Sequence, residues 1–132
     1  CLTAHNGKQF VCASCSEDGT VVISGLQPQQ DGTPPPPEVY LFGSPILALH
    51  LDPLYGRWVK DKTFVTGGVA GRLLLNRRGW WGHEETLLHE GEGPISAIAW
   101  RGPLVAWASE RGIKIMDVEK GKGGQRLSYI DK

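Results

Sequence analysis

The residues with the clearest potential for chemistry are two cysteines three positions apart, Cys12 and Cys15. In a thiol-redox enzyme such a pair opens a helix, because the helix N-terminus lowers the thiol pKa. Here the surrounding residues alternate as in a β-strand, where positions i and i+3 point to opposite faces of the sheet. Neither a disulfide nor a shared metal ion fits that geometry, and the four histidines are scattered along the chain. We therefore interpret the pair as buried strand cysteines.

Two glycine-rich stretches raise the question of a nucleotide site. Gly91-Glu92-Gly93 lacks the third glycine of a dinucleotide fingerprint, and no helix pattern follows it. Gly121–Gly124 lacks the spacing and the trailing hydroxyl residue of a Walker motif. No Ser or Cys has a His and a carboxylate at the spacing of a known nucleophile motif. We interpret both stretches as turns, and we expect no enzymatic activity, no cofactor and no metal site.

One stretch combines arginines with adjacent aromatic residues and could bind a partner. It reads Arg77-Arg78-Gly79-Trp80-Trp81. Such residues stack on bases, lie at membrane interfaces or anchor protein partners. In a strand, however, one of two neighbouring Trp side chains faces the core, so a structural role is the alternative. The candidate partner surface therefore consists of Arg77, Arg78, Trp80 and Trp81.

The composition narrows the class of protein. The chain has 132 residues, the length of one ordinary domain, and 40% of them are hydrophobic, which supports a packed core. Fourteen Lys and Arg balance fourteen Asp and Glu, so no long-range field attracts nucleic acid, and we expect no nucleic-acid partner. No apolar run approaches the roughly 18 to 20 residues that span a bilayer. Three cysteines without a framework spacing favour the cytosol.

The elements that must position these residues are predicted to be β-strands, because the sequence pattern repeats with a period of two residues. Residues typical of strands flank three turns that each close on a glycine, which predicts three hairpins. At the first turn, Asp18-Gly19 predicts a type I′ turn with positive φ at both residues. The predicted strand pairs are Phe10–Cys15 with Thr20–Ile23, Thr63–Thr66 with Arg72–Leu75, and Leu104–Ala108 with Ile113–Met116.

These hairpins belong to a longer repeat. Pro45-Ile46 and Pro94-Ile95 each open a further strand ahead of a hairpin, and outer strands fit Glu38–Phe42, Glu85–Leu88 and Gln125–Ile130. A repeat of about 40 to 50 residues with about four strands per unit is typical of propeller blades. The sequence predicts an all-β, incomplete WD-repeat-type β-propeller of about two to three antiparallel four-stranded blades. The predicted blades are 1–43, which lacks its innermost strand, 44–91 and 92–132.

Two further expectations follow from the propeller prediction. Because a propeller closes with roughly four to eight blades, we expect a fragment whose end sheets leave apolar faces bare. The Pro-rich stretch Gln27–Pro37 cannot form a ladder, so it is expected to be an exposed, partly polyproline loop. Such a loop is either a mobile insertion or a ligand for an aromatic groove, and we favour the first interpretation.

The stretch Leu88–Asp117 carries the most specific pattern, with Leu-His-x-Gly-Glu-Gly, then Trp-Arg-Gly-x-Leu-x-Ala-Trp-Ala, then Gly-Ile-Lys-Ile. It resembles the N-terminal WD-repeat propellers of the vacuolar protein sorting protein 41 family, and the resemblance extends over nearly the whole chain. The Pro-rich insertion and the Gly-Lys-Gly near position 121 depart from the family pattern, but both are placed in loops. The matching residues, which we interpret as structural, are Gly93, Ile95, Trp100, Arg101, Gly102, Trp107, Gly112 and Lys114.

The structural role of these motif residues can also be interpreted from physical principles, without the resemblance. Trp100 and Trp107 are placed on neighbouring strands, where large aromatic side chains fill the space between blades. Gly102-Pro103 is predicted to form the hairpin between those strands, and Pro94 suits a position where no ladder donor is needed.

The resemblance implies a protein-binding subunit of the HOPS tethering complex, which acts in vesicle transport and fusion at late endosomes, lysosomes or vacuoles. It implies as partners the other tether subunits, Rab or Arf-like small GTPases and an adaptor complex, with peripheral association to endosomal or vacuolar membranes from the cytoplasm. The helical solenoid and the zinc-binding C-terminal module of the family do not match these residues, so no metal site is carried over. The alternatives are a generic WD-repeat adaptor of another cytosolic complex and a thiol-redox enzyme.

Overall fold

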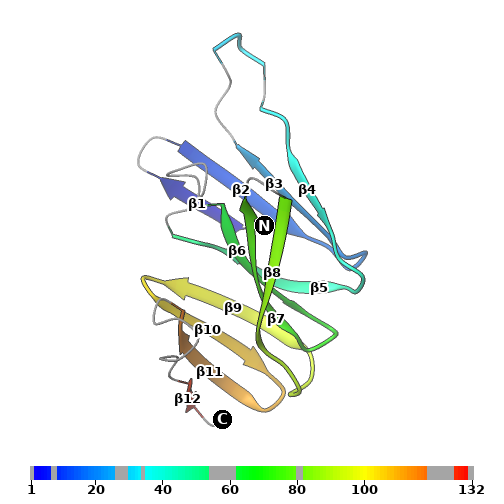
Figure 1. The fold of residues 1–132 in the computed structure, drawn as a ribbon, viewed down its shortest axis with the longest axis vertical. Helices are drawn as coiled ribbons and strands as arrows, with labels where there is room; N and C mark the ends of the chain where they lie inside the picture. The colour runs from blue at the N-terminus through cyan, green and yellow to red at the C-terminus, as the bar shows by residue number, and fades with distance from the viewer. Residues whose placement is uncertain are drawn as a thin grey trace.

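The computed structural model describes residues 2–6, 9–25, 30–33, 35–53, 62–79, 82–118 and 127–130. These residues form twelve β-strands and no helix (Figure 1). The strands are β1 (Leu2–Asn6), β2 (Gln9–Cys15), β3 (Thr20–Gly25), β4 (Glu38–Leu41), β5 (Ile46–Leu51), β6 (Thr63–Gly68), β7 (Leu73–Gly79), β8 (Gly82–His89), β9 (Ile95–Arg101), β10 (Leu104–Ser109), β11 (Gly112–Asp117) and β12 (Leu127–Ile130).

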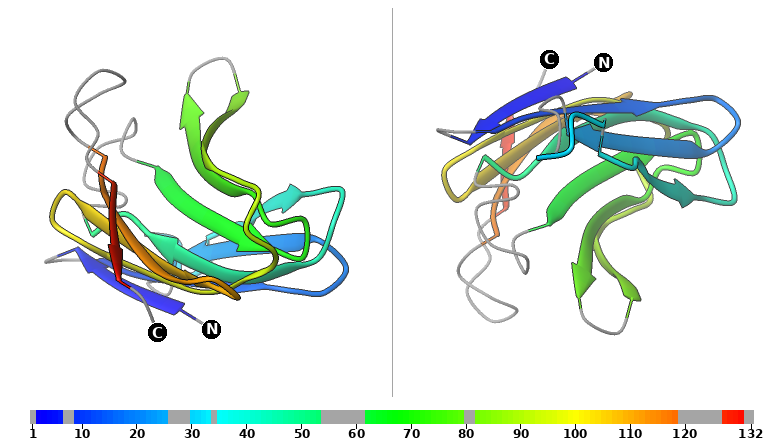
Figure 2. Two further views of the ribbon diagram at one scale, coloured as in Figure 1. Left: turned by 90° about the horizontal axis from the view of Figure 1, so that it is seen from below. Right: turned by 90° about the horizontal axis from the view of Figure 1, so that it is seen from above.

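The strands form three four-stranded sheets, and within each sheet every strand is antiparallel to its neighbours in the chain. The N-terminal sheet contains β1 to β4, the middle sheet β5 to β8, and the C-terminal sheet β9 to β12. The first strands of the sheets lie together, since β5 contacts both β1 and β9 (Figure 2). The predicted all-β class with antiparallel four-stranded sheets is confirmed.

The first sheet differs from the prediction, because it has its innermost strand. The backbone of β1 pairs with β2 in the register Leu2↔Ala13 to Asn6↔Gln9. The sequence Leu-Thr-Ala-His-Asn contains only one large apolar residue, so no strand was expected there. Pairing with β2 holds this segment in the sheet, which shows that ladder hydrogen bonds and neighbouring strands outweigh a weak local preference.

All three predicted hairpins are confirmed, but the predicted type I′ turn is wrong. No residue other than glycine has a positive φ, so Asp18 does not adopt the left-handed conformation, whereas Gly19 does, at 86°. The Gly19 N–H donates to the Ser16 carbonyl oxygen at 3.1 Å, and the Asp18 carboxylate accepts from the Thr20 N–H at 2.9 Å. Asp18 therefore serves as a side-chain acceptor in the turn, which only Gly19 closes with positive φ.

The β7–β8 hairpin is longer than the sequence predicted. We expected strands over Arg72–Leu75 and Glu85–Leu88, because the apolar pattern ends there. The ladder continues through Arg77↔Glu84 to Gly79↔Gly82. The far end of this hairpin curves away from the stacked sheets (Figure 2), so polar side chains are tolerated along it.

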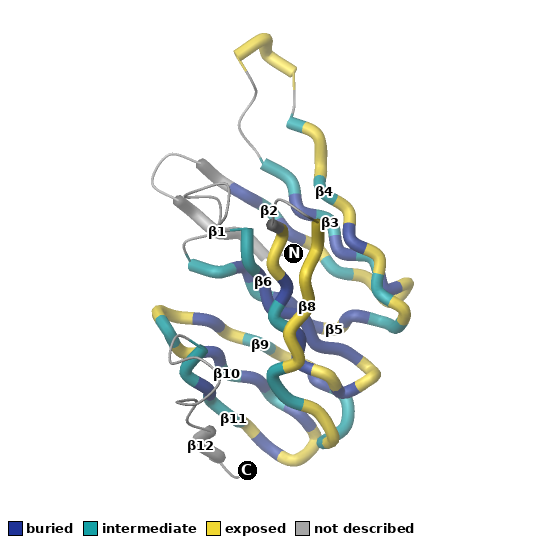
Figure 3. The backbone as a smooth tube through the Cα atoms, in the orientation of Figure 1, coloured by how far each residue is buried: buried dark blue, intermediate teal, exposed yellow. Residues whose placement is uncertain are grey.

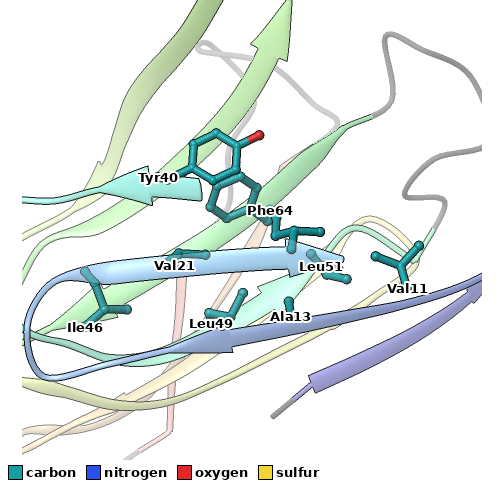
Figure 4. Close-up of a cluster of buried hydrophobic side chains, with 9 residues drawn as sticks. Val11, Ala13, Val21, Tyr40, Ile46, Leu49, Leu51 and Phe64 are labelled. Atoms are coloured by element: carbon teal, nitrogen blue, oxygen red, sulfur yellow. The ribbon is translucent and has the colours of Figure 1, made fainter. Parts of the chain in front are cut away.

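Two apolar cores lie between the sheets. The first lies between the N-terminal and middle sheets (Figure 4) and consists of Val11, Ala13, Val21, Ile23, Tyr40, Ile46, Leu49, Leu51 and Phe64. Its aromatic pair is Tyr40 and Phe64, with ring centroids 4.9 Å apart. The second lies between the middle and C-terminal sheets and consists of Val65, Leu73, Ile95, Trp100, Val105, Trp107 and Met116.

The alternation of side chains explains why the middle sheet serves both cores. Phe64 and Val65 are adjacent in β6 and both are fully buried, so they point to opposite faces of the sheet. Phe64 belongs to the first core and Val65 to the second. Cover on both faces also explains why every residue of β6 after Thr63 is buried.

The described part of the Pro-rich stretch agrees with an exposed loop. Residues 30–33 and 35–37 form no strand, and apart from the half-buried Pro35 they are exposed (Figure 3). The loop extends beyond the sheets at one end of the molecule (Figure 1). Residues 26–29 and Pro34 lie outside the described residues.

Candidate functional site

The predicted partner surface is described in part. Arg77 and Arg78 lie near the end of β7, and both are exposed. Trp80 and Trp81 lie outside the described residues, so their placement stays a prediction. The two arginines differ in their surroundings, because alternation in the strand directs them to opposite faces of the middle sheet.

Arg78 belongs to a polar cluster centred on Glu38, which we call the Glu38 cluster (Glu38, Tyr40, Lys62 and Arg78). The Lys62 ammonium and the Tyr40 hydroxyl both donate to the Glu38 carboxylate, the latter at 3.0 Å. Arg78 Nη1 lies 3.9 Å from the same carboxylate. The cluster joins β4 of the N-terminal sheet to β7 of the middle sheet, so it connects two sheets by charge as well as by apolar contact.

The surroundings of Glu38 shift two pKa values. Burial opposes ionisation of Glu38, but the hydrogen bond and positive charge of Lys62 outweigh it and lower the pKa of the Glu38 carboxyl. Burial and the negative charge of Glu38 raise the pKa of Tyr40 to about 12. At neutral pH the cluster therefore contains a carboxylate, a neutral phenol and two cations.

A second polar group, which we call the Asn76 network, lies beside this cluster. Asn76 is fully buried, and its amide donates to the Thr66 hydroxyl at 3.0 Å and the Leu74 carbonyl at 3.2 Å. His83 Nε2 lies 2.9 Å from Asn76 Oδ1. The His83 ring contacts Tyr40 with ring centroids 5.0 Å apart, so the network reaches the Glu38 cluster through aromatic packing.

The sequence pattern indicated neither the Glu38 cluster nor the Asn76 network. Glu38 was expected only as the first residue of an outer strand. A signal was available for Asn76, because it follows Leu73–Leu75 at a position where strand alternation predicts a core residue. A polar residue there needs buried hydrogen-bond partners. Their identity depends on β6 and β8, which local pattern does not specify.

The family-motif tryptophans lie in the second core. Trp107 is 2% exposed and Trp100 7% exposed, on the paired strands β10 and β9. Trp100 Nε1 donates to the Gly102 carbonyl oxygen at 3.0 Å, which ties the ring to the turn that Gly102 forms with a φ of 56°. The Trp107 ring contacts His89 of β8, with ring centroids 5.3 Å apart, and both tryptophans belong to the core between the middle and C-terminal sheets, as expected for residues that fill this space.

The motif residue Lys114 has a charge partner. Its ammonium donates to the carboxylate of Glu92, and His89 Nε2 lies 3.1 Å from the other carboxylate oxygen. The hydrogen bond from Lys114 lowers the pKa of Glu92. Gly91-Glu92-Gly93 lies in the bend that connects β8 to β9, with Glu92 held between Lys114 of β11 and His89 at the end of β8.

The remaining motif residues lie at turns or strand ends. Ile95, the first residue of β9, is 1% exposed, whereas Arg101 at the other end of β9 is exposed. Gly93 and Gly112 have φ values of 81° and 125°, which disfavour any residue with a Cβ. Gly121–Gly124 lies outside the described residues.

The two strand cysteines are free thiols and half-buried, not buried as predicted. Cys15 packs at the margin of the first core, and burial raises the pKa of its thiol. Cys12 points to the opposite face of the sheet, as the strand geometry predicts. A raised thiol pKa is the reverse of what a redox nucleophile needs.

The described residues also bear on other classes of function. They contain no group of three or more His, Cys, Asp or Glu side chains arranged to hold a metal ion. No helix long and apolar enough to span a bilayer occurs in the part of the chain that the structure describes.

Comparison with known proteins identifies the family. A family model for the β-propeller of vacuolar protein sorting protein 41, described as "Vps42 beta-propeller", matches residues 2–132. The chain belongs to this propeller family. The three sheets are therefore part of a β-propeller that is incomplete within these residues, as the sequence predicted.

Relatives from distant organisms support this membership. The vacuolar protein sorting-associated protein 41 homologue of Arabidopsis thaliana is 40% identical over 119 residues, which cover 90% of this chain. The human homologue is 40% identical over 105 residues, covering 79% of this chain, and the Saccharomyces cerevisiae protein is 30% identical over 128 residues, covering 86%. The chain spans 11% to 12% of the length of these relatives.

Proposed function

We propose that the chain is part of a protein-binding scaffold in a HOPS-type membrane tether. The observation that carries this proposal is the family match over residues 2–132, together with relatives named for vacuolar protein sorting. The scaffold acts in vesicle transport and fusion at the late endosome, lysosome or vacuole, including protein targeting to the vacuole. It associates peripherally with these membranes from the cytoplasm and contributes binding surfaces without chemistry of its own.

Each of the three sheets is one blade of this propeller in the proposal, with boundaries at 1–43, 44–91 and 92–132. The strand order within each sheet supports this division, since each sheet is formed by four consecutive strands. A rigid stack of sheets presents its outer strands and connecting loops to partners, while the cores between the sheets fix their spacing. The proposed partners are other tether subunits, a Rab or Arf-like small GTPase, and an adaptor complex.

The experiment that tests the tether assignment is affinity purification of the full-length protein from cells, followed by mass spectrometry. Co-purification of the other tether subunits is the expected result. Recovery of a different cytosolic complex without those subunits would favour a generic WD-repeat adaptor and overturn the assignment. Loss of cellular function in a Cys12→Ser, Cys15→Ser double variant that still folds would instead favour thiol chemistry.

Within the scaffold, we assign the exposed end of the β7–β8 hairpin to partner contact. Arg77 supports this assignment, because it is exposed near the tip of a hairpin that curves away from the stacked sheets (Figure 2). Arg78 is the less suitable contact, since the Glu38 carboxylate already lies 3.9 Å from its guanidinium.

Charge reversal at the hairpin tests this surface in the full-length protein. Arg77→Glu and Trp81→Ala are expected to reduce recovery of at least one partner by about tenfold, the size of effect that a central contact residue produces. Arg72→Glu is the matched control, because Arg72 is also exposed but precedes β7 at its other end. Unchanged recovery in both hairpin variants, with stable folding, would remove the hairpin as a contact.

A further inference from the structure

The Pro-rich loop between β3 and β4 carries an exposed hydroxyl side chain. Residues 30–33 are exposed, and the loop extends beyond the sheets at one end of the molecule (Figure 1, Figure 3). Thr33 lies in this exposed stretch, and the sequence continues with four prolines, Pro34 to Pro37. The proposed scaffold role gives no purpose to this threonine or to the prolines that follow it.

The surroundings of Thr33 leave its hydroxyl accessible. Both the N–H and the hydroxyl of Thr33 donate to Asp31 Oδ1, at 3.0 and 2.6 Å. These two bonds are exposed, so water or another protein can replace them at little cost. Two residues further on, the loop returns to the N-terminal sheet, where a Cβ on Gly25 would lie 3.2 Å from Pro35 Cγ. The loop is therefore anchored at Pro35, and Thr33 lies before this anchor in the exposed part.

A threonine that precedes proline in an accessible segment suits a proline-directed protein kinase. Such a kinase binds its acceptor in an extended conformation, and its catalytic Asp accepts the hydroxyl proton. Proline favours an extended backbone at the residue before it, because its ring clashes with the α conformation there. Proline also has no N–H, so it fits a kinase site that offers no hydrogen-bond acceptor at this position. The prolines that follow favour an extended chain, which reduces the conformational entropy lost on binding.

The sequence contains two hydroxyl residues directly followed by proline, and the structure distinguishes them. The second is Ser44, which precedes Pro45, and both of these residues are half-buried between β4 and β5. Before this pair, the Phe42 N–H donates to the Gly19 carbonyl oxygen at 2.8 Å. After it, the Val69 N–H donates to the Pro45 carbonyl oxygen at 3.2 Å. A kinase would have to detach this segment from turns of two sheets to bind it in an extended form.

We propose that Thr33 is a phosphorylation site for a proline-directed serine/threonine kinase, and that Ser44 is not. In the reaction, Thr33 Oγ forms a bond to the γ-phosphorus of ATP, and the bond from that phosphorus to the bridging oxygen breaks. The hydroxyl proton passes to the catalytic Asp of the kinase, and the products are phosphothreonine and ADP. The site goes beyond the proposed scaffold function and does not depend on it.

Phosphorylation changes the charge and the hydrogen bonding of the loop. Residues 27–37 contain one charged residue, Asp31, and no Lys or Arg. The phosphate ester has no hydroxyl hydrogen, so the bond from Thr33 Oγ to Asp31 is lost, and a charge of about −1.5 to −2 lies beside the carboxylate. Repulsion between the two groups opens the turn, and the loop has no cation to neutralise the phosphate. The phosphate is therefore expected to stay in solvent, where a phosphatase or a phosphate-binding partner can reach it.

Phosphopeptide mapping of the full-length protein tests the proposal. The protein is purified with phosphatase inhibitors from cells that express it natively, digested, and analysed by mass spectrometry. We expect phosphate on Thr33 at an occupancy about tenfold or more above that of Ser44, because the Ser44 segment must first open locally. Ser44 is the internal control, since it has the same following residue. Absence of phosphate from Thr33, or equal occupancy of the two sites, would overturn the proposal.

Variants of the loop identify what the kinase recognises. The dephosphorylated full-length protein is incubated with a purified cyclin-dependent kinase and Mg-ATP, and incorporation at position 33 is measured. Pro34→Ala should lower the rate by about tenfold or more, whereas Thr33→Ser keeps the hydroxyl and the proline and should still be modified. Thr33→Val, which lacks the hydroxyl, gives the background. An unchanged rate in Pro34→Ala would show that the proline is not recognised and would overturn the proposal, with circular dichroism confirming that each variant folds.

The mapping experiment is independent of the tether assignment, because it does not require any partner to co-purify. If Thr33 carries phosphate but tether subunits do not co-purify, the proposed function fails while the phosphorylation site stands. If tether subunits co-purify and Thr33 carries no phosphate, the phosphorylation site fails while the function stands.

Discussion

Asn76 shows how one side chain contributes to the middle sheet. Its amide is fully buried and donates hydrogen bonds to β6 and to its own strand, while its oxygen faces His83. A buried polar group of this kind is stabilising only while its partners are present, because an unpaired donor or acceptor carries its full desolvation cost. The network therefore makes β6, β7 and β8 depend on one another.

Replacing Asn76 by alanine is expected to be costly. Asn76→Ala removes a partner of the buried Thr66 hydroxyl and leaves space in the core, so the free energy of unfolding should fall by about 1 to 3 kcal/mol. Thr86→Ala is the control, because Thr86 is exposed and its loss should change stability by less than about 0.5 kcal/mol. Urea denaturation measures the free energy of unfolding of both variants. Equal stability of the two variants would contradict the assigned role of Asn76.

Tyr40 gives a prediction for alkaline pH. The fold raises its pKa to about 12, through burial and the negative charge of Glu38. The folded protein thus favours the neutral phenol. The contribution of Tyr40 to the free energy of unfolding is fully present below about pH 10, the pKa of an unfolded tyrosine, and is lost as the pH rises from there towards 12. The difference in phenolate absorbance between the parent chain and Tyr40→Phe measures this ionisation.

A charge variant separates the two causes of the Tyr40 shift. Glu38→Gln removes the negative charge but keeps a hydrogen-bond acceptor, so the ionisation of Tyr40 should move down from about pH 12 but stay above the unfolded value, because burial remains. Ionisation of Tyr40 near pH 10 in the parent chain would contradict its placement between the two sheets.

At the scale of the elements, the contact between Ile95 and Gly67 positions one sheet on the next. Ile95 is the first residue of β9, and it packs at position 67 of the middle sheet. Only glycine fits there, because a side chain would collide with Ile95. Glycine weakens a strand, because it has no side chain to pack. The glycine at position 67 therefore shows that packing between the sheets has priority over strand preference here.

Gly67→Ala tests this contact. The added methyl group collides with Ile95, so we expect a loss of about 1 to 3 kcal/mol in the free energy of unfolding, as for other overpacked cores. In an Ile95→Ala background the same substitution should cost less but not nothing, because the nearest colliding atom, Ile95 Cγ2, is gone while the Cβ of residue 95 remains 2.9 Å from the added methyl group. Gly43→Ala is the matched control, since nothing lies within 4 Å of a Cβ at position 43. Equal costs in both backgrounds would contradict direct contact.

The sequence predicted elements better where a turn residue marked their ends. The glycines at 19, 71 and 112 have positive φ and were sufficient to place three hairpins. By contrast, β1 has one large apolar residue in five, and the outer half of the β7–β8 hairpin is polar. Both are held by pairing with a neighbouring strand, which a local pattern does not report.

At the scale of the whole molecule, the stack of three sheets leaves one face of the C-terminal sheet uncovered within these residues. This face carries Ala97, Ala99, Leu104, Ala106, Ala108 and Ile113, with Arg101 and Asp117 beside Leu104. The sequence predicted bare apolar faces at the end sheets from the number of blades, but it did not predict which side chains form them. That required the register of β9 against β10, in which a shift near Ser109 brings Ala97 opposite Ala108. A shift of one residue would have directed different side chains outward.

The open face predicts the solution behaviour of the 132-residue chain. We expect association that increases with concentration, because burial of exposed apolar area on a second copy is favourable. Ile113→Glu, which places a charge on this open face of the C-terminal sheet, should reduce the association. Leu87→Glu is the control, as Leu87 is 48% exposed on β8, away from that face. Sedimentation velocity measures the mass of the species present at each protein concentration. A monomer at every concentration would contradict the prediction.

The strand order described above also has a consequence for biosynthesis. Among the twelve described strands, each pairs only with the strand directly before or after it in the chain, so no strand of these sheets waits for a partner synthesised much later. Closing short loops costs little entropy, and contacts between near neighbours in sequence form quickly. A nascent chain that emerges from the ribosome is therefore expected to complete the N-terminal sheet first and to use its apolar face as the template on which the middle sheet is laid down.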